Sequence, residues 1–75
     1  MTANEMFEAL KYKSYIEYDR LCYINEDEEK SITFFKDMKK YLPFRNLKSA
    51  PVPLMLTTDE HKAITQQMKE LGWLE

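Results

Sequence analysis

The sequence predicts a small α+β domain: a helix, a three- or four-stranded antiparallel β-meander and a second helix, with both helices on one face of the sheet. Two patterns predict this class. Apolar residues recur every three or four positions at both ends of the chain, which is typical of amphipathic helices. In the middle, short aromatic and β-branched runs alternate with polar connections, which is typical of a meander. The 75 residues suffice for one hydrophobic core, so we expect a single domain over residues 1–75.

The first helix is predicted to begin at Thr2. Glu5 follows Thr2 by three residues, which is the spacing of a capping box, in which each side chain accepts a hydrogen bond from the other residue's backbone N–H. We expect the helix to end near Lys11. Its apolar residues share one side: Ala3, Met6, Phe7 and Leu10.

Four short runs are predicted to form the sheet: Ser14–Tyr18, Leu21–Ile24, Ser31–Phe35 and Tyr41–Phe44. We expect Asp19 and Arg20 to form the first tight turn, and the four acids Glu26–Glu29 to form the tip of the second. Pro43 indicates that the fourth run is an edge strand, because proline cannot donate a hydrogen bond to a neighbour.

Alternation along these runs predicts two apolar sheet faces. On the helix side we expect Ile16, Tyr18, Ile32 and Phe34, together with either Leu21 and Tyr23 or Cys22 and Ile24. The opposite side would then carry Tyr15, Thr33 and Phe35. That side either exposes aromatic rings or meets a partner.

The last helix has the clearest boundaries, and it follows a proline-containing loop over Arg45–Leu56. Thr57 and Glu60 have the capping-box spacing, and Gly72 is placed to end the helix. Its predicted apolar stripe begins at a histidine: His61, Ile64, Met68 and Leu71.

The residues give little support for catalysis. Asp59 and His61 point about 200° apart on a helix, so they cannot share a metal ion. A nucleophilic pair of Cys22 and His61 stays open, although a packed strand cysteine is the favoured interpretation. The acids Glu26–Glu29 lack the alternating ligands and the glycine of a calcium loop, so we interpret them as a solvated turn. We therefore expect no enzyme, no metal site and no cofactor.

A basic and aromatic segment over residues 34–48 is the strongest functional signal. Its basic residues are Lys36, Lys39, Lys40, Arg45 and Lys48, and its aromatic residues are Phe34, Phe35, Tyr41 and Phe44. Such residues on a sheet can bind single-stranded nucleic acid by charge and stacking. They equally suit a core with lysines along an edge strand, or a protein interface. The candidate contact residues are Lys36, Lys39, Lys40, Arg45, Tyr15 and Phe35.

The single cysteine, the N-terminal residues and the short apolar runs favour a cytoplasmic protein. The net charge is −2, and the one cysteine cannot form an internal disulfide. The N-terminal residues do not resemble a secretory signal. The longest apolar run, Pro51–Leu56, is far shorter than the roughly 20 residues of a membrane span.

Both ends of the chain resemble a known group of sequences. The stretches TANEMFEALKYKSYIEYD and LTTDEHKAITQQMKELGWLE are similar to the two ends of small uncharacterised proteins of phages and prophages of low-GC Gram-positive bacteria (Firmicutes). The resemblance implies a helix–sheet–helix fold and an accessory protein acting in the host cytoplasm. Lys11 stands where those proteins often have glycine, so a left-handed helix cap is not expected there. His61 stands where they tend to be apolar, and no functional residue carries over.

Together these observations favour a non-enzymatic protein–protein interaction module. Its expected partner is another protein or a second copy of itself, forming a dimer. The alternative is a small nucleic-acid-binding protein that uses the basic and aromatic segment.

Overall fold

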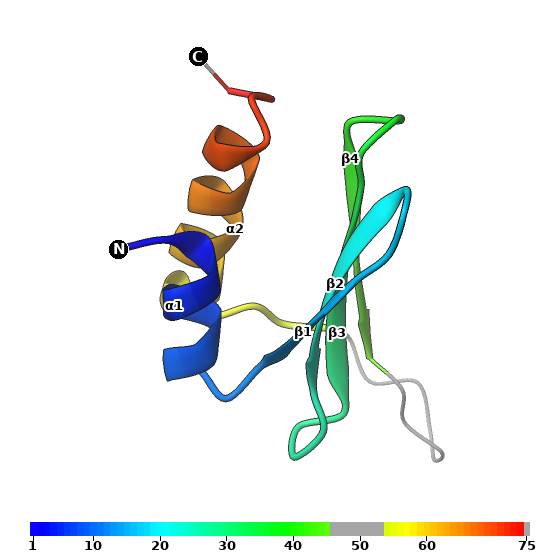
Figure 1. Ribbon diagram of the computed structural model, residues 1–75. Coiled ribbons are helices and arrows are strands. Elements are labelled where there is room, and N and C mark those ends of the chain that lie inside the picture. The colour runs from blue at the N-terminus through cyan, green and yellow to red at the C-terminus, as the bar shows by residue number, and fades with distance from the viewer. Residues whose placement is uncertain (46–53, 75) are drawn as a thin grey trace.

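The computed structural model of the protein describes residues 1–45 and 54–74. Within these ranges the elements are α1 (Ala3–Ala9), β1 (Lys13–Ile16), β2 (Arg20–Asn25), β3 (Lys30–Phe35), β4 (Lys40–Arg45) and α2 (Thr58–Glu70). The strands form one antiparallel sheet in the order β1-β2-β3-β4. Both helices lie on the same side of this sheet (Figure 1). The predicted α+β class is confirmed, with four strands; the expected proline loop lies largely outside the described residues.

The two helices begin in the same way. Thr2 and Thr57 are the N-caps, and each accepts a hydrogen bond from the backbone N–H three residues later. The glutamates at those positions, Glu5 and Glu60, accept hydrogen bonds from the N-cap backbone in return. Both predicted capping boxes are therefore confirmed.

The two helices also end in the same way. Tyr12 N–H donates to the Phe7 carbonyl and Trp73 N–H donates to the Met68 carbonyl, each at 2.9 Å. The residue before each donor has left-handed backbone, with φ of +69° at Lys11 and +77° at Gly72. The lysine at position 11 therefore does not prevent a left-handed cap, contrary to the sequence-based expectation. The six-residue hydrogen bond and the burial of Tyr12 hold the chain in that conformation.

The first turn differs from its prediction. Ile16 pairs with Leu21, and Glu17 N–H donates to the Arg20 carbonyl at 2.9 Å, so the turn residues are Tyr18 and Asp19. The prediction of the turn at Asp19–Arg20 was therefore wrong by one residue. Tyr18 is fully exposed, and its predicted place on the helix side was also wrong.

The core lies between the helices and one face of the sheet. Ile32 and Phe34 are fully buried as predicted, and Tyr23 shows that Leu21 and Tyr23, rather than Cys22 and Ile24, face the helices. Phe7 of α1 stacks on Tyr23 with ring centroids 3.9 Å apart. The buried apolar set is Ala3, Phe7, Tyr12, Tyr23, Ile32, Phe34, Ala63 and Ile64.

One residue expected on the helix side of the sheet and the residue at the edge of the predicted α2 stripe are exposed. Ile16 pairs with Leu21 and so lies on the helix side of the sheet, as predicted. It is nevertheless 77% exposed, because it lies at the end of the short edge strand β1. His61, at the edge of the predicted α2 stripe, is exposed, whereas Ile64 is buried and Met68 and Leu71 pack against the core as predicted. The buried residues of α2 are Glu60, Ala63, Ile64 and Gln67. The helix therefore packs on the sheet with a face that includes two polar side chains.

Candidate functional site

The sheet side that faces away from both helices, called the outer face below, is the most distinctive surface of the molecule. Because side chains alternate along each strand, the residues between the buried ones point to this side. Strand register arranges them in rows across the sheet. The first row is Lys13, Ile24, Ser31 and Phe44, the middle row is Tyr15, Cys22, Thr33 and Leu42, and the last row is Arg20, Phe35 and Lys40.

Large apolar side chains stand open on the outer face. Tyr15 is 45% exposed, Leu42 51% and Phe44 54%. No element of the described chain covers this side of the sheet in Figure 1. The sequence-based expectation that the second sheet face carries Tyr15, Thr33 and Phe35 is therefore confirmed, and the rings of Tyr15 and Phe44 on it are accessible, whereas Phe35 is half-buried.

Charged residues border the apolar part of the face. The Arg20 guanidinium lies over the Phe35 ring, 5.4 Å from its centroid. Arg20 Nε also lies 3.2 Å from Asp19 Oδ1 and 3.6 Å from Glu17 Oε2. The hydrogen bond from Arg20 lowers the pKa of Asp19. Arg20 is thus occupied by acids of its own chain, whereas Lys13 and Lys40 on the same face have no ion pair with another described residue.

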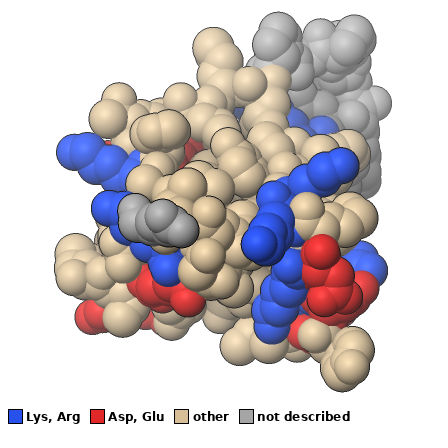
Figure 2. Space-filling view, turned by 90° about the horizontal axis from the view of Figure 1, so that it is seen from above, with Lys and Arg blue, Asp and Glu red and all other residues tan. Residues whose placement is uncertain are grey.

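The two ends of the sheet differ in charge. The β2–β3 turn is formed by the four acids Glu26–Glu29, and the β3–β4 turn, at the opposite end, contains Lys36 and Lys39 and leads into Lys40. Figure 2 looks onto the end with the β1–β2 and β3–β4 turns, where basic side chains gather next to acidic ones. The β2–β3 turn itself therefore carries only acids, with Lys13, Lys30 and Arg45 on the adjoining strand ends, and the opposite end of the sheet is mixed and mainly basic.

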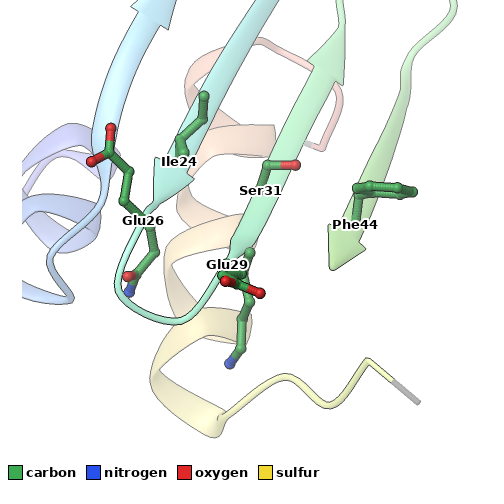
Figure 3. Close-up of a pocket in the computed structure, with 7 residues that line it drawn as sticks. Ile24, Glu26, Glu29, Ser31 and Phe44 are labelled. Atoms are coloured by element: carbon green, nitrogen blue, oxygen red, sulfur yellow. The ribbon is translucent and has the colours of Figure 1, made fainter. Parts of the chain in front are cut away.

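A shallow pocket of about 370 Å³ lies at the acidic end of the sheet. Figure 3 shows Ile24, Ser31 and Phe44 side by side on neighbouring strands, with Glu26 and Glu29 from the adjoining turn beside them. The pocket thus joins the first row of the outer face to the acidic tip. It contains no convergent set of catalytic groups; it is an apolar floor with an acidic rim.

The structure separates the six candidate contact residues into groups. Tyr15, Phe35 and Lys40 lie together on the outer face. Lys36 and Lys39 lie in the β3–β4 turn. Arg45 pairs with the buried Lys30 and therefore points to the helix side.

The other members of the basic and aromatic segment also separate. Phe34 is buried in the core and Tyr41 is on the helix side, whereas Phe44 is on the outer face. Lys48 falls outside the described residues.

A buried polar network at the start of α2 was missed by sequence reasoning. The Glu60 carboxylate accepts hydrogen bonds from the Tyr12 hydroxyl, from Thr57 N–H at 2.8 Å and from Lys30 Nζ at 3.4 Å. Lys30 Nζ also lies 3.0 Å from Glu28 Oε2. The network connects the end of α1, the start of β3 and the N-terminus of α2. No local signal in the sequence joins residues 12, 30 and 60.

The network fixes the ionisation of its members. Burial alone raises the pKa of Glu60, but the hydrogen bonds from Tyr12 and Thr57 and the charge of Lys30 lower it overall. Burial alone lowers the pKa of Lys30, but Glu28 and Glu60 raise it overall. Burial and the adjacent carboxylate raise the pKa of Tyr12. Each group keeps its ordinary charge at neutral pH, so the network is a structural connection rather than a proton-transfer site.

The two residues considered for nucleophilic chemistry lie on opposite sides of the sheet. Cys22 is half-buried on the outer face, where Thr33 Oγ1 lies 3.3 Å from its sulfur. His61 is exposed on α2, which covers the other face. The sheet therefore stands between the thiol and the imidazole, and they cannot act as a pair.

The described ranges contain no group of three or more His, Cys, Asp or Glu side chains that could hold a metal ion. Neither helix within these ranges is long and apolar enough to cross a membrane. Comparison of the chain with protein-family models, curated proteins and solved structures finds no match.

Proposed function

We propose that the chain is a non-enzymatic protein-binding module that uses the outer face of its sheet. The observation that carries this proposal is the set of open apolar side chains in adjoining rows, Tyr15, Leu42 and Phe44. Open apolar side chains gathered on one sheet face are costly to expose to water and are typical of interaction sites. The charged border supplies the polar rim that protein interfaces usually have.

The setting of this activity is part of the same proposal. The ends of the chain resemble small phage and prophage proteins of Firmicutes, and such a protein would act in the host cytoplasm. The module would bind the surface of another protein, and such binding requires no cofactor.

The proposal is tested with a single charge placed on the outer face. Leu42→Glu introduces a carboxylate at a half-exposed position of the face, and Met55→Glu makes the matched change at a position that is 72% exposed and outside the rows. Immobilised wild-type and variant chains are used to capture proteins from a lysate of the encoding organism, and captured proteins are purified and tested again. Light scattering of each chain reports binding to itself.

We expect wild type and Met55→Glu to bind the same protein, or themselves, and Leu42→Glu to lose at least tenfold in affinity. A strictly monomeric chain that captures no protein in a Leu42-dependent manner contradicts the proposal.

A second candidate function is binding of single-stranded nucleic acid. The observation that favours it is that three aromatic residues, Tyr15, Phe35 and Phe44, share the outer face with Lys13 and Lys40. Bases can stack on exposed rings while lysines contact phosphates. The adjoining acidic turn and the acids bound to Arg20 would repel a polyanion, which favours the protein-binding function over this one.

Fluorescence anisotropy with a labelled oligothymidine at low salt tests this candidate. Lys40→Glu should abolish a salt-dependent signal, whereas Lys62→Glu on the exposed part of α2 should leave it unchanged. The absence of any signal at low salt rules the candidate out.

A further inference from the structure

We infer that the partner of the outer face is a second copy of this chain, packed face to face with its strands antiparallel to those of the first. The two-fold axis crosses the strands at the middle row, which contains Tyr15, Cys22, Thr33 and Leu42. This inference rests on the proposed function, because it names the partner of the same surface.

The edges of the sheet are poor sites for a second copy. β1 offers only four residues, Lys13–Ile16. β4 contains Pro43, which has no N–H to donate to an added strand. The outer face, by contrast, presents side chains from four strands at once.

The charges at the two ends of the sheet select the antiparallel arrangement. A two-fold axis across the strands brings the acidic turn Glu26–Glu29 of each copy to the end where the other copy has Lys36, Lys39 and Lys40 beside Asp37, and where Glu17 and Asp19 are paired with Arg20. A two-fold axis along the strands would instead place the two acidic turns at the same end, where they would repel each other. Electrostatic complementarity of this kind determines orientation in protein interfaces.

Individual positions on β1 agree with the same arrangement. Glu17 extends the face beyond Tyr15 at one end of β1, and Lys13 lies at the other end. The antiparallel axis places Glu17 opposite the partner subunit's Lys13, and symmetry repeats the contact. Residues of the middle row then meet their own counterparts, so Leu42 at the edge of the face lies opposite the partner subunit's Leu42.

The size of the face indicates a weak dimer. Four strands about 4.8 Å apart and six residues of about 3.4 Å each give a projected area of roughly 400 Å² per copy. The two copies together would bury about 800 Å² of projected area, and more when side-chain relief is included, which is below the roughly 1,000 Å² of a stable specific interface and suits only a weak one. We therefore expect a dimer that forms at micromolar or higher concentrations and weakens as salt screens its end charges.

Because Leu42 would meet its own counterpart, oppositely charged variants at this position provide a specific test. Leu42→Glu alone places carboxylate against carboxylate, and Leu42→Lys alone places ammonium against ammonium. A mixture of the two variants places unlike charges together. Analytical ultracentrifugation of wild type, each variant and the 1:1 mixture is carried out up to about 1 mM. Met55→Glu is the control for added charge, and circular dichroism verifies the fold of each chain.

We expect wild type and Met55→Glu to dimerise, each Leu42 variant to bind itself at least tenfold more weakly, and the mixture to recover at least tenfold in affinity over either variant. A monomeric wild type at about 1 mM overturns the inference, while the proposed function is then decided by the Leu42-dependent capture of another protein. Weakened variants without recovery in the mixture overturn the two-fold arrangement but support binding through the face. Dimers that are insensitive to Leu42 overturn both.

Discussion

At the scale of single residues, three non-glycine residues within 1–45 and 54–74 have left-handed backbone, which glycine would adopt without strain. They are Lys11, with φ of +69°, Glu29, with +54°, and Lys39, with +52°. Glu29 and Lys39 are each the last residue of a four-residue connection between strands. A residue with a Cβ atom in this region costs roughly 1–2 kcal/mol. This cost is tolerated because the strands on both sides of each turn are paired in the sheet.

Lys39→Gly should therefore raise the free energy of unfolding by roughly 0.5–1 kcal/mol, after the greater freedom of glycine in the unfolded chain is subtracted. Lys36→Gly is the matched control, because it removes the same side chain from the same turn at a position without positive φ. It should lower the free energy of unfolding. Urea denaturation measures both variants, and equal effects of the two would contradict the backbone explanation.

The buried carboxylate of Glu60 should make stability depend on pH in the acidic range. Its pKa is lower in the folded chain than the ordinary 4.5, so its ionisation stabilises the fold above about pH 4.5. That contribution is lost as the pH falls through the folded-state pKa. Lys30, whose pKa is raised, loses its own contribution only in alkaline solution, as the pH rises through its folded-state pKa.

Glu60→Gln keeps a side chain suited to the capping box but removes the charge that faces Lys30. We expect it to reduce the free energy of unfolding by about 1–3 kcal/mol at neutral pH, because Lys30 loses one of its two carboxylate partners. The difference from wild type should shrink as the pH falls below 4.5 and through the lower folded-state pKa, where wild type loses the same charge. Denaturation at pH 7 and pH 3.5 measures this, and a difference that does not change with pH would show that the charge is not responsible.

At the scale of elements, the two helices are defined by local rules at both ends. Each begins with a threonine–glutamate capping box and ends with a left-handed residue followed by an aromatic residue, Tyr12 or Trp73. The aromatic residue after each cap packs on the core, with Trp73 and Phe34 ring centroids 6.1 Å apart. The caps therefore both stop the helices and attach them to the sheet.

The N-cap of α2 offers a direct test of this role. Thr57→Ala removes the hydroxyl that accepts from Glu60 N–H at 3.0 Å, and it should reduce the free energy of unfolding by about 1 kcal/mol. Thr58→Ala, at the next and exposed position, is the matched control and should be nearly neutral. Thermal unfolding followed by circular dichroism distinguishes them. Equal losses in the two variants would mean that the hydroxyl of Thr57 does not cap the helix.

Features that depend on local rules could be predicted from the sequence, and features that depend on distant contacts could not. Thr57, Glu60 and Gly72 have meaning at fixed spacings along one helix, so both of its ends were correct. The pairing of Glu60 with Lys30 and Tyr12 joins positions far apart in the chain. The choice between the two faces of β2 was undecided because Leu21 and Cys22 are both apolar.

The same limit applies to the candidate site. Alternation along β1 and β3 was enough to place Tyr15 and Phe35 on one face. Whether that face is open depends on where α1 and α2 pack, which no single strand specifies. Arg45 was grouped with Lys40 by nearness in sequence, but the odd number of steps between them sends the two side chains to opposite faces of β4.

At the scale of the whole molecule, the helices cover one face of the sheet and leave the other face open. The core is built almost wholly between the helices and the sheet, so the open rings of Tyr15 and Phe44 contribute little to folding of the single copy. If a second copy covers them, stability becomes a property of the pair. Folding and association are then linked through protein concentration.

This linkage predicts that the thermal unfolding midpoint of wild type rises with protein concentration. A tenfold excess over the dissociation constant adds about 1.4 kcal/mol to the folded state, which corresponds to a rise of roughly 5–10 °C for a domain of this length. Leu42→Glu should match wild type when both are dilute, because Leu42 is 51% exposed and adds little to the core. It should fall below wild type as concentration increases. Differential scanning calorimetry over a hundredfold concentration range, about 10 μM to 1 mM, measures both. A flat midpoint for wild type, or an equal rise in the variant, would show that the outer face is not where the copies meet.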